Sequence, residues 1–243
     1  MGENSAPGPL ALVGGAELGP GNEPADRVLA AAAGSGPAYV LATAAARHRP
    51  ELAVAHAAGW FARFGLEVRE LPATGRRQAR SPENAARARE GRFFYLVGGD
   101  PGIVPATLRD TPVWDGVVQA WRSGAALAGS SAGAMALGGW TLTRDARPGD
   151  DRRRYTPALG LVPGLAVIPH FETFGAGWVA SARSGAPDGD VVIVGIDERT
   201  AAVWTDGVWR AMGPGLVTVM QGRATATFGS EREIEGLPQP ALD

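Results

Sequence analysis

The chain of 243 residues contains no cysteine, which excludes disulfide bonds, thiolate catalysis and cysteine-ligated metal sites. It also contains no lysine, so arginine supplies the side-chain positive charge at neutral pH. The absence of lysine excludes a lysine nucleophile, a Schiff base and the phosphate-binding lysine of a P-loop. Because the chain has only three histidines, a mechanism that needs an imidazole has few candidates.

Long apolar runs are absent as well, so no segment is expected to span a membrane. The first residues lack the basic segment and apolar core of a signal peptide. The net charge of −2 gives no strong attraction to nucleic acid or to an anionic membrane surface. We therefore expect a cytoplasmic protein without nucleic-acid or membrane partners. The sequence leaves its oligomeric state open, a homodimer included.

With 45% hydrophobic residues, the chain can bury a sizeable core. Short apolar segments alternate with helical patterns, which is typical of a mostly parallel sheet covered on both faces. The expected strands are residues 10–13, 38–43, 66–71, 93–97, 125–128, 166–168 and 191–196. The expected helices are residues 25–33, 50–64, 82–89 and 107–122.

The remaining segments complete the predicted domain organisation. Residues 141–156 are rich in Arg, Asp, Pro and Gly and are expected to form a long loop. The apolar segments between 201 and 220 predict a small antiparallel extension, because Asp206-Gly207 is a good hairpin turn. We expect one α/β domain over residues 10–228, with flexible tails at 1–9 and 229–243.

The segment from Leu127 to Leu137, LAGSSAGAMAL, contains the pattern G-x-S-x-G. An apolar run leads into it and small helix-forming residues follow, as in a nucleophile elbow, where a serine stands on a sharp turn between a strand and a helix. Glycines on both sides let such a strained turn close. The pattern predicts Ser131 as a nucleophile, although in a glycine-rich chain it also fits a turn without chemistry.

A serine nucleophile needs a base within hydrogen-bond reach, and the base is most often an imidazole. His48 lies in a charged segment, and His56 lies within a helical pattern rich in alanine. His170 follows a short apolar strand, and the carboxyl ends of parallel strands meet at one edge of a sheet. We therefore predict that His170 is the base.

Two carboxylates compete for the role of orienting the imidazole. Asp145 lies in the loop that follows the elbow helix, whereas Glu172 is two residues beyond His170, on the same side of an extended segment. Asp150 and Asp151 are weaker candidates in the same loop as Asp145. The residues alone do not decide between these alternatives.

An oxyanion needs backbone N–H donors. Ala132, which follows the candidate nucleophile, is expected to supply one of them. Gly99, in the glycine-rich turn after the strand 93–97, is expected to supply another, since a glycine permits close backbone approach. Asp100, next to Gly99, and Ser130, next to Ser131, are the candidate substrate contacts. We expect neither a metal nor a cofactor.

Five segments together resemble one known family: GGAE at 14–17, YLVGGD at 95–100, GSSAGAM at 129–135, PHF at 169–171 and GIDERTA at 195–201. They are similar to the dipeptidase E and cyanophycinase family of serine peptidases. The resemblance implies the class I glutamine amidotransferase-like (flavodoxin-like) fold, a three-layer α/β/α sandwich. It also implies Ser131 as nucleophile, His170 as base and oxyanion donors near Gly99 and Ala132, and it favours Asp145 over Glu172. The GIDE segment is expected to stabilise the sheet edge and its turn.

That family hydrolyses peptide bonds next to aspartate, in small dipeptides or in the polymer cyanophycin. This sequence departs from the cyanophycinase pattern at Pro101, where those proteins carry a glutamine, and after Phe171, where their segment continues to an arginine. Proline has neither an amide side chain nor a backbone N–H, so it cannot replace a hydrogen-bonding glutamine.

The sequence therefore predicts a serine-type peptidase or amidohydrolase that cleaves a small peptide or amide through an acyl-enzyme. The alternative is an inactive ligand-binding or partner-binding module on the same fold. Glutamine amidotransfer is a weaker hypothesis, because that chemistry normally uses a cysteine at the elbow.

Overall fold

The computed structural model describes residues 6–144, 152–187 and 191–242. Its strands are β1 (Leu10–Val13), β2 (Ala38–Leu41), β3 (Val68–Glu70), β4 (Phe93–Leu96), β5 (Ala126–Ser130), β6 (Gly138–Arg144), β7 (Arg153–Pro157), β8 (Val162–Pro169), β9 (Val192–Ile196), β10 (Ala201–Thr205), β11 (Val208–Met212), β12 (Val217–Gln221) and β13 (Ala224–Phe228).

Helices lie in each connection from β1 to β6 and in the connection between β8 and β9. They are α1 (Glu23–Ala33), α2 (Pro50–Phe61), the short 3-10 helix η1 (Ala62–Phe64), α3 (Arg76–Ala79), α4 (Pro82–Glu90), α5 (Ile103–Leu108), α6 (Pro112–Arg122), α7 (Ala132–Leu137) and α8 (Phe171–Ser184). None of the helices in the described residues is both long and apolar enough to span a membrane.

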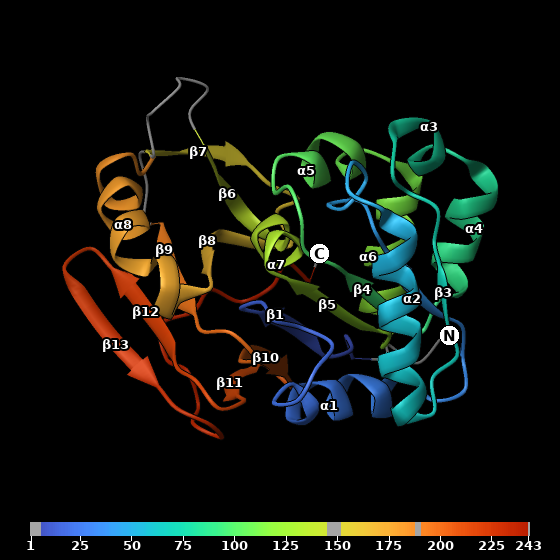
Figure 1. The fold of residues 1–243 in the computed structure, drawn as a ribbon, viewed down its shortest axis with the longest axis horizontal. Helices are drawn as coiled ribbons and strands as arrows, with labels where there is room; N and C mark the ends of the chain where they lie inside the picture. Colours follow the sequence, from blue (N-terminus) through green and yellow to red (C-terminus); the bar gives the residue numbers. More distant parts are fainter. Residues whose placement is uncertain (1–5, 145–151, 188–190, 243) are drawn as a thin grey trace.

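Within the described residues the strands form two sheets. The seven-stranded sheet has the order β11-β10-β1-β5-β4-β2-β3, and the six-stranded sheet has the order β13-β12-β9-β8-β6-β7. In the seven-stranded sheet the strands from β1 to β3 pair in parallel, and the antiparallel strands β10 and β11 lie at one edge. In the six-stranded sheet β6, β8 and β9 pair in parallel, and antiparallel strands lie on both sides of them. The predicted α/β class with mostly parallel pairing is confirmed, and the strands divide between two sheets rather than one (Figure 1).

The central strands β1, β5 and β4 of the seven-stranded sheet bury both of their faces, as continuous apolar runs require. Phe93 and Tyr95 on β4 belong to the core on the side of α1 and α2, whereas Phe94 and Leu96 belong to the core on the side of α6. Helix α7 packs against β1, β5, β6 and β8 and therefore joins the two sheets. It lies at the centre of the molecule in Figure 1.

Two predicted elements need correction, and one helix was missed. The expected loop 141–156 contains parts of β6 and β7, which pair antiparallel from Trp140 to Arg144. The expected helix 107–122 is divided into α5 and α6, because Thr111 caps α6 by accepting a hydrogen bond from the Trp114 N–H and Pro112 starts the new helix. Helix α8 was not expected at all.

The chain ends also differ from the predicted flexible tails where the structure describes them. Trp121 Nε1 donates a hydrogen bond to the Gly8 carbonyl at 2.8 Å. At the other end, Trp204 Nε1 donates to Gln239 Oε1 at 2.7 Å, and Ile234 is only 4% exposed. Both rings are buried, and a buried indole N–H needs a hydrogen-bond partner. Through Gln239 and the buried Ile234, the segment 229–242 packs against the fold.

Asp26 on α1 is a carboxylate buried in the core. It is 1% exposed and accepts a hydrogen bond from Trp60 Nε1 at 2.7 Å. Burial raises the pKa of the Asp26 carboxyl from the ordinary 3.8 to about 7, while the Trp60 hydrogen bond opposes the rise and Glu23 and Glu17 add to it.

This pKa makes the stability of the fold depend on pH. Between pH 3.8 and about 7 the folded chain binds more protons at Asp26 than the unfolded chain, so the free energy of unfolding falls as the pH rises through that window. Asp26→Asn keeps an acceptor for Trp60 but does not titrate. We expect this variant to gain up to about 4 kcal/mol of stability relative to wild type between the two ends of the window. Urea unfolding of both proteins measures the effect, and a difference that is independent of pH would contradict it.

Candidate active site

Ser131 stands on the turn between β5 and α7, with φ of 50° and ψ of −113°. A non-glycine residue rarely adopts this conformation, which costs energy. The two glycines of the pattern are required sterically, because a Cβ on Gly129 would overlap the backbone of Gly133 and a Cβ on Gly133 would overlap the Leu96 carbonyl. The G-x-S-x-G segment therefore forms the sharp turn that its sequence predicted.

A chain of hydrogen bonds leads from Ser131 into the second sheet. Ser131 Oγ lies 3.1 Å from His170 Nε2, and His170 Nδ1 lies 2.7 Å from Glu198 Oε1. When Nδ1–H donates to the Glu198 carboxylate, Nε2 carries the lone pair that accepts the serine proton. The arrangement is that of a serine, an imidazole base and an orienting carboxylate.

The parallel pairing of β8 with β9 explains why His170 and Glu198 meet. Pro169 at the end of β8 is paired with Ile196 at the end of β9, so the residues that follow both strands emerge at the same sheet edge. His170 has a φ of 48°, which turns the chain from β8 into α8. This bend directs the imidazole toward α7 and the first sheet.

The turn after β1 joins the two sheets at this point. The His170 N–H donates to the Gly14 carbonyl at 2.7 Å, the Arg199 N–H donates to the Gly15 carbonyl at 2.8 Å, and the Gly14 N–H donates to the Thr200 carbonyl at 2.9 Å. Gly15 has a φ of 117°, and a Cβ there would overlap the imidazole ring of His170. The GGAE segment thus fixes the imidazole relative to the first sheet.

Glu198 was not among the carboxylates predicted to orient His170. One of them, Glu172, contacts the Glu198 N–H instead, with its two carboxylate oxygens at 3.1 and 3.2 Å. The expectation for Glu172 assumed an extended segment, whereas residue 172 lies in the first turn of α8. Asp145, Asp150 and Asp151 lie outside the described residues. The available signal for Glu198 was its position two residues after the buried strand β9.

The glycine-rich turn after β4 lies beside Ser131. Gly99 has a φ of 143°, and a Cβ there would overlap the Ala44 carbonyl, so only glycine fits. The Gly98 N–H donates to Glu17 Oε1 at 3.1 Å. The next residue, Gly99, is exposed, so its N–H lies in the exposed part of the turn. Ala132 is the first residue of α7, where a helix leaves N–H groups without an intrahelical acceptor.

The two candidate substrate contacts are placed differently. Asp100 is half-buried, and its Oδ1 accepts a hydrogen bond from the Gly102 N–H at 2.8 Å, so it shapes its own turn. Ser130 is 0% exposed, because it is the last residue of a central strand. The expectation that Ser130 contacts a substrate is therefore corrected. No group of side chains in the described residues has the composition of a metal site.

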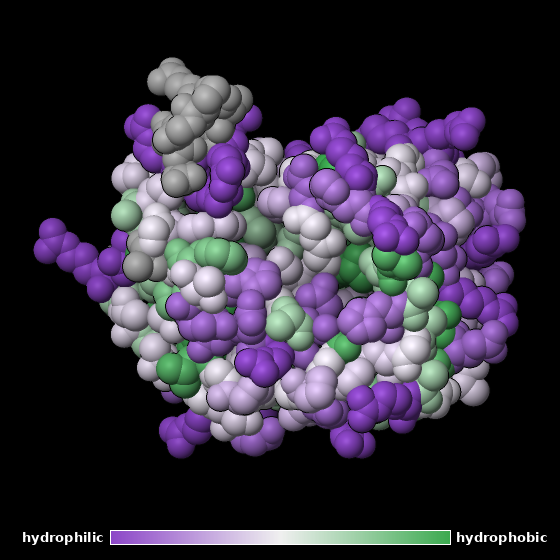
Figure 2. Space-filling view, viewed as in Figure 1, coloured by the Kyte–Doolittle hydropathy of each residue, from purple (hydrophilic) through white to green (hydrophobic). Residues whose placement is uncertain are grey.

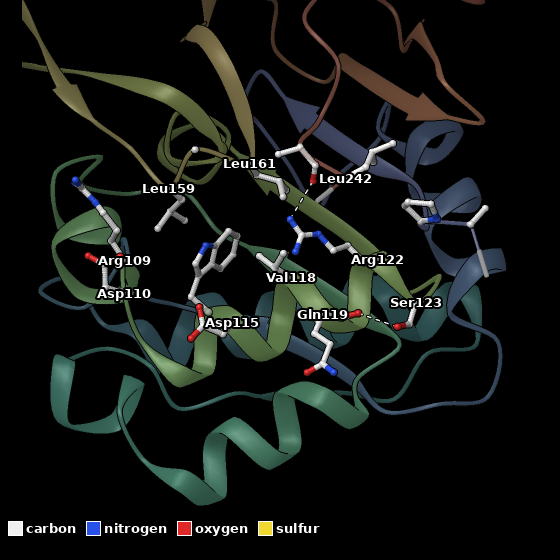
Figure 3. Close-up of a pocket in the computed structure, with 15 residues that line it drawn as sticks. Arg109, Asp110, Asp115, Val118, Gln119, Arg122, Ser123, Leu159, Leu161 and Leu242 are labelled. Carbon is white, nitrogen blue, oxygen red and sulfur yellow. Dashed lines mark hydrogen bonds between the residues drawn. The ribbon is translucent and has the colours of Figure 1, made fainter. Parts of the chain in front are cut away.

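A cavity of about 810 Å³ lies away from this site, between α6, the segment 159–161 and the C-terminal residues. Figure 3 shows Val118 of α6 facing Leu161 across it, and Arg122 donates to the Ala241 carbonyl at 3.4 Å. Its described lining includes none of Ser131, His170 and Glu198. The cavity therefore has no part in the hydrogen-bond chain.

Comparison with known proteins agrees with this geometry. The model of peptidase family S51 matches residues 10–209. The chain belongs to peptidase family S51. The dipeptidase E and cyanophycinase resemblance is thereby confirmed, and this member of the family is a serine-type peptidase.

Individual relatives in the family are similar over most of the chain. A cyanophycinase from Trichormus variabilis is 31% identical over 216 residues, which cover 86% of this chain and 72% of that protein. The crystal structure of a peptidase from an acI-B1 Actinobacterium has a TM-score of 0.83 at 30% identity and covers 96% of this chain and 98% of that one. A putative peptidase E from Listeria monocytogenes shares the fold, with a TM-score of 0.57 at 16% identity, covering 91% of this chain and 98% of that one.

The steric role of Gly15 gives a direct test. We expect Gly15→Ala to lower the rate constant for hydrolysis of a small activated ester, p-nitrophenyl acetate, by about 100-fold, because it displaces the His170 ring. The matched control is Gly59→Ala on α2, where a Cβ meets nothing within 4 Å. That variant is expected to keep the wild-type rate. An unchanged rate in Gly15→Ala would contradict the positioning role of the turn.

Proposed function

We propose that this S51 peptidase hydrolyses the amide bond of a small peptide through an acyl-enzyme on Ser131. The observation that carries the proposal is the unbroken hydrogen-bond chain from Ser131 through His170 to Glu198, with distances of 3.1 and 2.7 Å. A ligand-binding module without activity needs neither this chain nor a serine held at a φ of 50°. These features favour catalysis over the binding alternative.

In the first half of the reaction, Ser131 Oγ attacks the carbonyl carbon of the amide while its proton passes to His170 Nε2. The tetrahedral intermediate then collapses: the carbon–nitrogen bond breaks, and the proton on Nε2 goes to the leaving nitrogen. The amine departs and the acyl group remains as an ester on Ser131. In the second half, water attacks the ester, gives a proton to His170, and the acid leaves as Ser131 regains its hydrogen.

The developing negative charge on the carbonyl oxygen needs donors that are already oriented. We assign this role to the backbone N–H groups of Gly99 and Ala132. A Cβ on Gly99 would overlap the Ala44 carbonyl, and Cβ atoms on Gly129 and Gly133, on either side of Ser131 and Ala132, would overlap neighbouring backbone, so both turns are sterically fixed. The N-terminus of α7 adds its positive dipole end at the same point, although the helix is short.

Glu198 holds the imidazole in the tautomer that the reaction needs and stabilises its charged form. Glu172 acts one step further away, since its carboxylate accepts the Glu198 N–H and fixes that backbone. We therefore assign the third position to Glu198, in place of Asp145 or Glu172. Glu17 holds the Gly98–Gly99 turn in the same way, through the Gly98 N–H.

The substrate is proposed to be a small peptide. The named relatives include cyanophycinases and a putative peptidase E, and the resemblance points to bonds next to aspartate. Pro101 stands where cyanophycinases carry glutamine and offers no hydrogen-bond donor. This difference favours a dipeptide-sized substrate over the polymer.

The first test removes the nucleophile. Ser131→Ala is expected to lower the release of amino acids from a dipeptide library by at least about 10³-fold. Its melting temperature should stay within about 2 °C of wild type, because the change removes one oxygen at the surface of the site. Mass spectrometry quantifies the products. Hydrolysis at the wild-type rate in this variant rules the mechanism out.

A second test compares the two glutamates. Glu198→Gln keeps the shape but removes the charge, and its amide favours the wrong imidazole tautomer, so kcat should fall by about 10² to 10⁴-fold. Glu172→Gln keeps an acceptor for the Glu198 N–H and should cost less than about tenfold. Equal losses in both variants, or no loss in Glu198→Gln, would contradict the assignment.

A further inference from the structure

Phe174 is an exposed aromatic residue beside the base. It lies on the first turns of α8, one helical turn beyond His170, and it is 45% exposed. Its ring centroid is 5.6 Å from that of the imidazole, at an interplanar angle of 68°. Exposing a large apolar ring has a cost in water, and one that also touches an active-site residue indicates a contact surface for a ligand.

Trp178 continues the same face of α8 one turn further on. Its ring stacks on Phe174, with centroids 6.0 Å apart and an interplanar angle of 18°. The Arg153 guanidinium of β7 lies 3.8 Å from the Trp178 ring centroid. The Tyr155 hydroxyl, also on β7, donates to the Ala182 carbonyl of α8 at 2.9 Å. We call Phe174 and Trp178 the aromatic shelf, and these contacts hold it in place.

The shelf is apolar and its two ends differ in charge: the Arg153 guanidinium lies over Trp178, whereas the end at Phe174 has acidic neighbours. The Glu198 carboxylate contacts the His170 ring, and the exposed Glu172 lies two residues before Phe174 on the same helix. In the space-filling view, apolar surface lies among polar areas on the side of the second sheet (Figure 2). An acidic side chain placed on Phe174 would be repelled by these carboxylates, whereas an aromatic or aliphatic side chain would not.

The chemistry decides which part of a substrate reaches the shelf. His170 Nε2 must deliver its proton to the leaving nitrogen, so the leaving residue approaches the imidazole. The carbonyl oxygen points the other way, toward the Gly99 and Ala132 N–H groups. We propose that the aromatic shelf is the subsite for the residue that leaves as the amine, and that it selects an apolar, preferably aromatic, side chain there. This assignment rests on the proposed acyl-enzyme mechanism.

The test uses dipeptide C-terminal amides that share the first residue giving the fastest turnover and carry Phe, Leu, Ala or Glu as the second residue. Wild type is expected to show a kcat/KM for the Phe peptide about tenfold or more above that for the Ala peptide, with the Glu peptide lowest. Phe174→Ala should reduce the Phe-to-Ala ratio to below about threefold, and Phe174→Leu should retain part of it.

The control is Leu52→Ala, which removes another exposed apolar side chain, on α2, that is 48% exposed. It should keep the wild-type ratio. The shelf proposal is overturned if wild type shows no preference for the Phe peptide, or if the Phe-to-Ala ratio of kcat/KM is unchanged in Phe174→Ala. In either case, hydrolysis that depends on Ser131 would still support the acyl-enzyme mechanism.

A binding measurement separates the two proposals further. If no dipeptide amide is hydrolysed, the acyl-enzyme proposal fails, and calorimetry with Ser131→Ala decides whether the shelf binds the Phe peptide more tightly than the Ala peptide. Equal affinities overturn the shelf. Circular dichroism melting curves of Phe174→Ala confirm that the variant is folded, which its exposure at 45% leads us to expect.

Discussion

The site depends on the hydrogen bonds that tie the Gly14-Gly15 turn of the first sheet to the residues after β8 and β9 of the second. Ser131 and His170 belong to different sheets, and small shifts between reacting groups are costly for catalysis. The carbonyls of Gly14 and Gly15 accept the His170 and Arg199 N–H groups at 2.7 and 2.8 Å. These bonds set the position of the imidazole, and through it that of Glu198, relative to the serine.

The same constraint explains why strained backbone is tolerated here. Ser131 and His170 both have positive φ, 50° and 48°, and such conformations cost of order 1–3 kcal/mol each. They persist because each residue follows a buried stretch of strand: β5 is buried along its whole length, and the last five residues of β8, 165–169, are buried. Both strained residues direct their side chains to the point where the sheets meet.

Much of the fold and part of the site could be predicted from the sequence. Continuous apolar runs gave the parallel strands, because both faces of such strands are buried. The nucleophile followed from a steric pattern, and His170 followed from the small number of histidines and its position after a strand. The family, the fold class and the serine-type peptidase activity are confirmed.

Glu198 could not be predicted, since its meeting with His170 depends on the register between β8 and β9, which local sequence does not determine. Glu172 was placed wrongly because the positive φ of His170 starts a helix where an extended segment was assumed. The division into two sheets was missed for a similar reason: strand pairing is a long-range property. Local patterns thus predicted the elements, and long-range pairing determined which side chains meet.

The most direct test of the account is covalent labelling of the wild-type protein with a fluorophosphonate, followed by peptide mapping. An activated serine reacts with this probe, and an ordinary hydroxyl does not. The account predicts a single adduct, on the peptide that contains Ser131, and none after Glu198 and His170 are replaced together. Labelling at another serine, or no labelling of the folded wild-type protein at any pH between about 6 and 9 where imidazole bases operate, would contradict it.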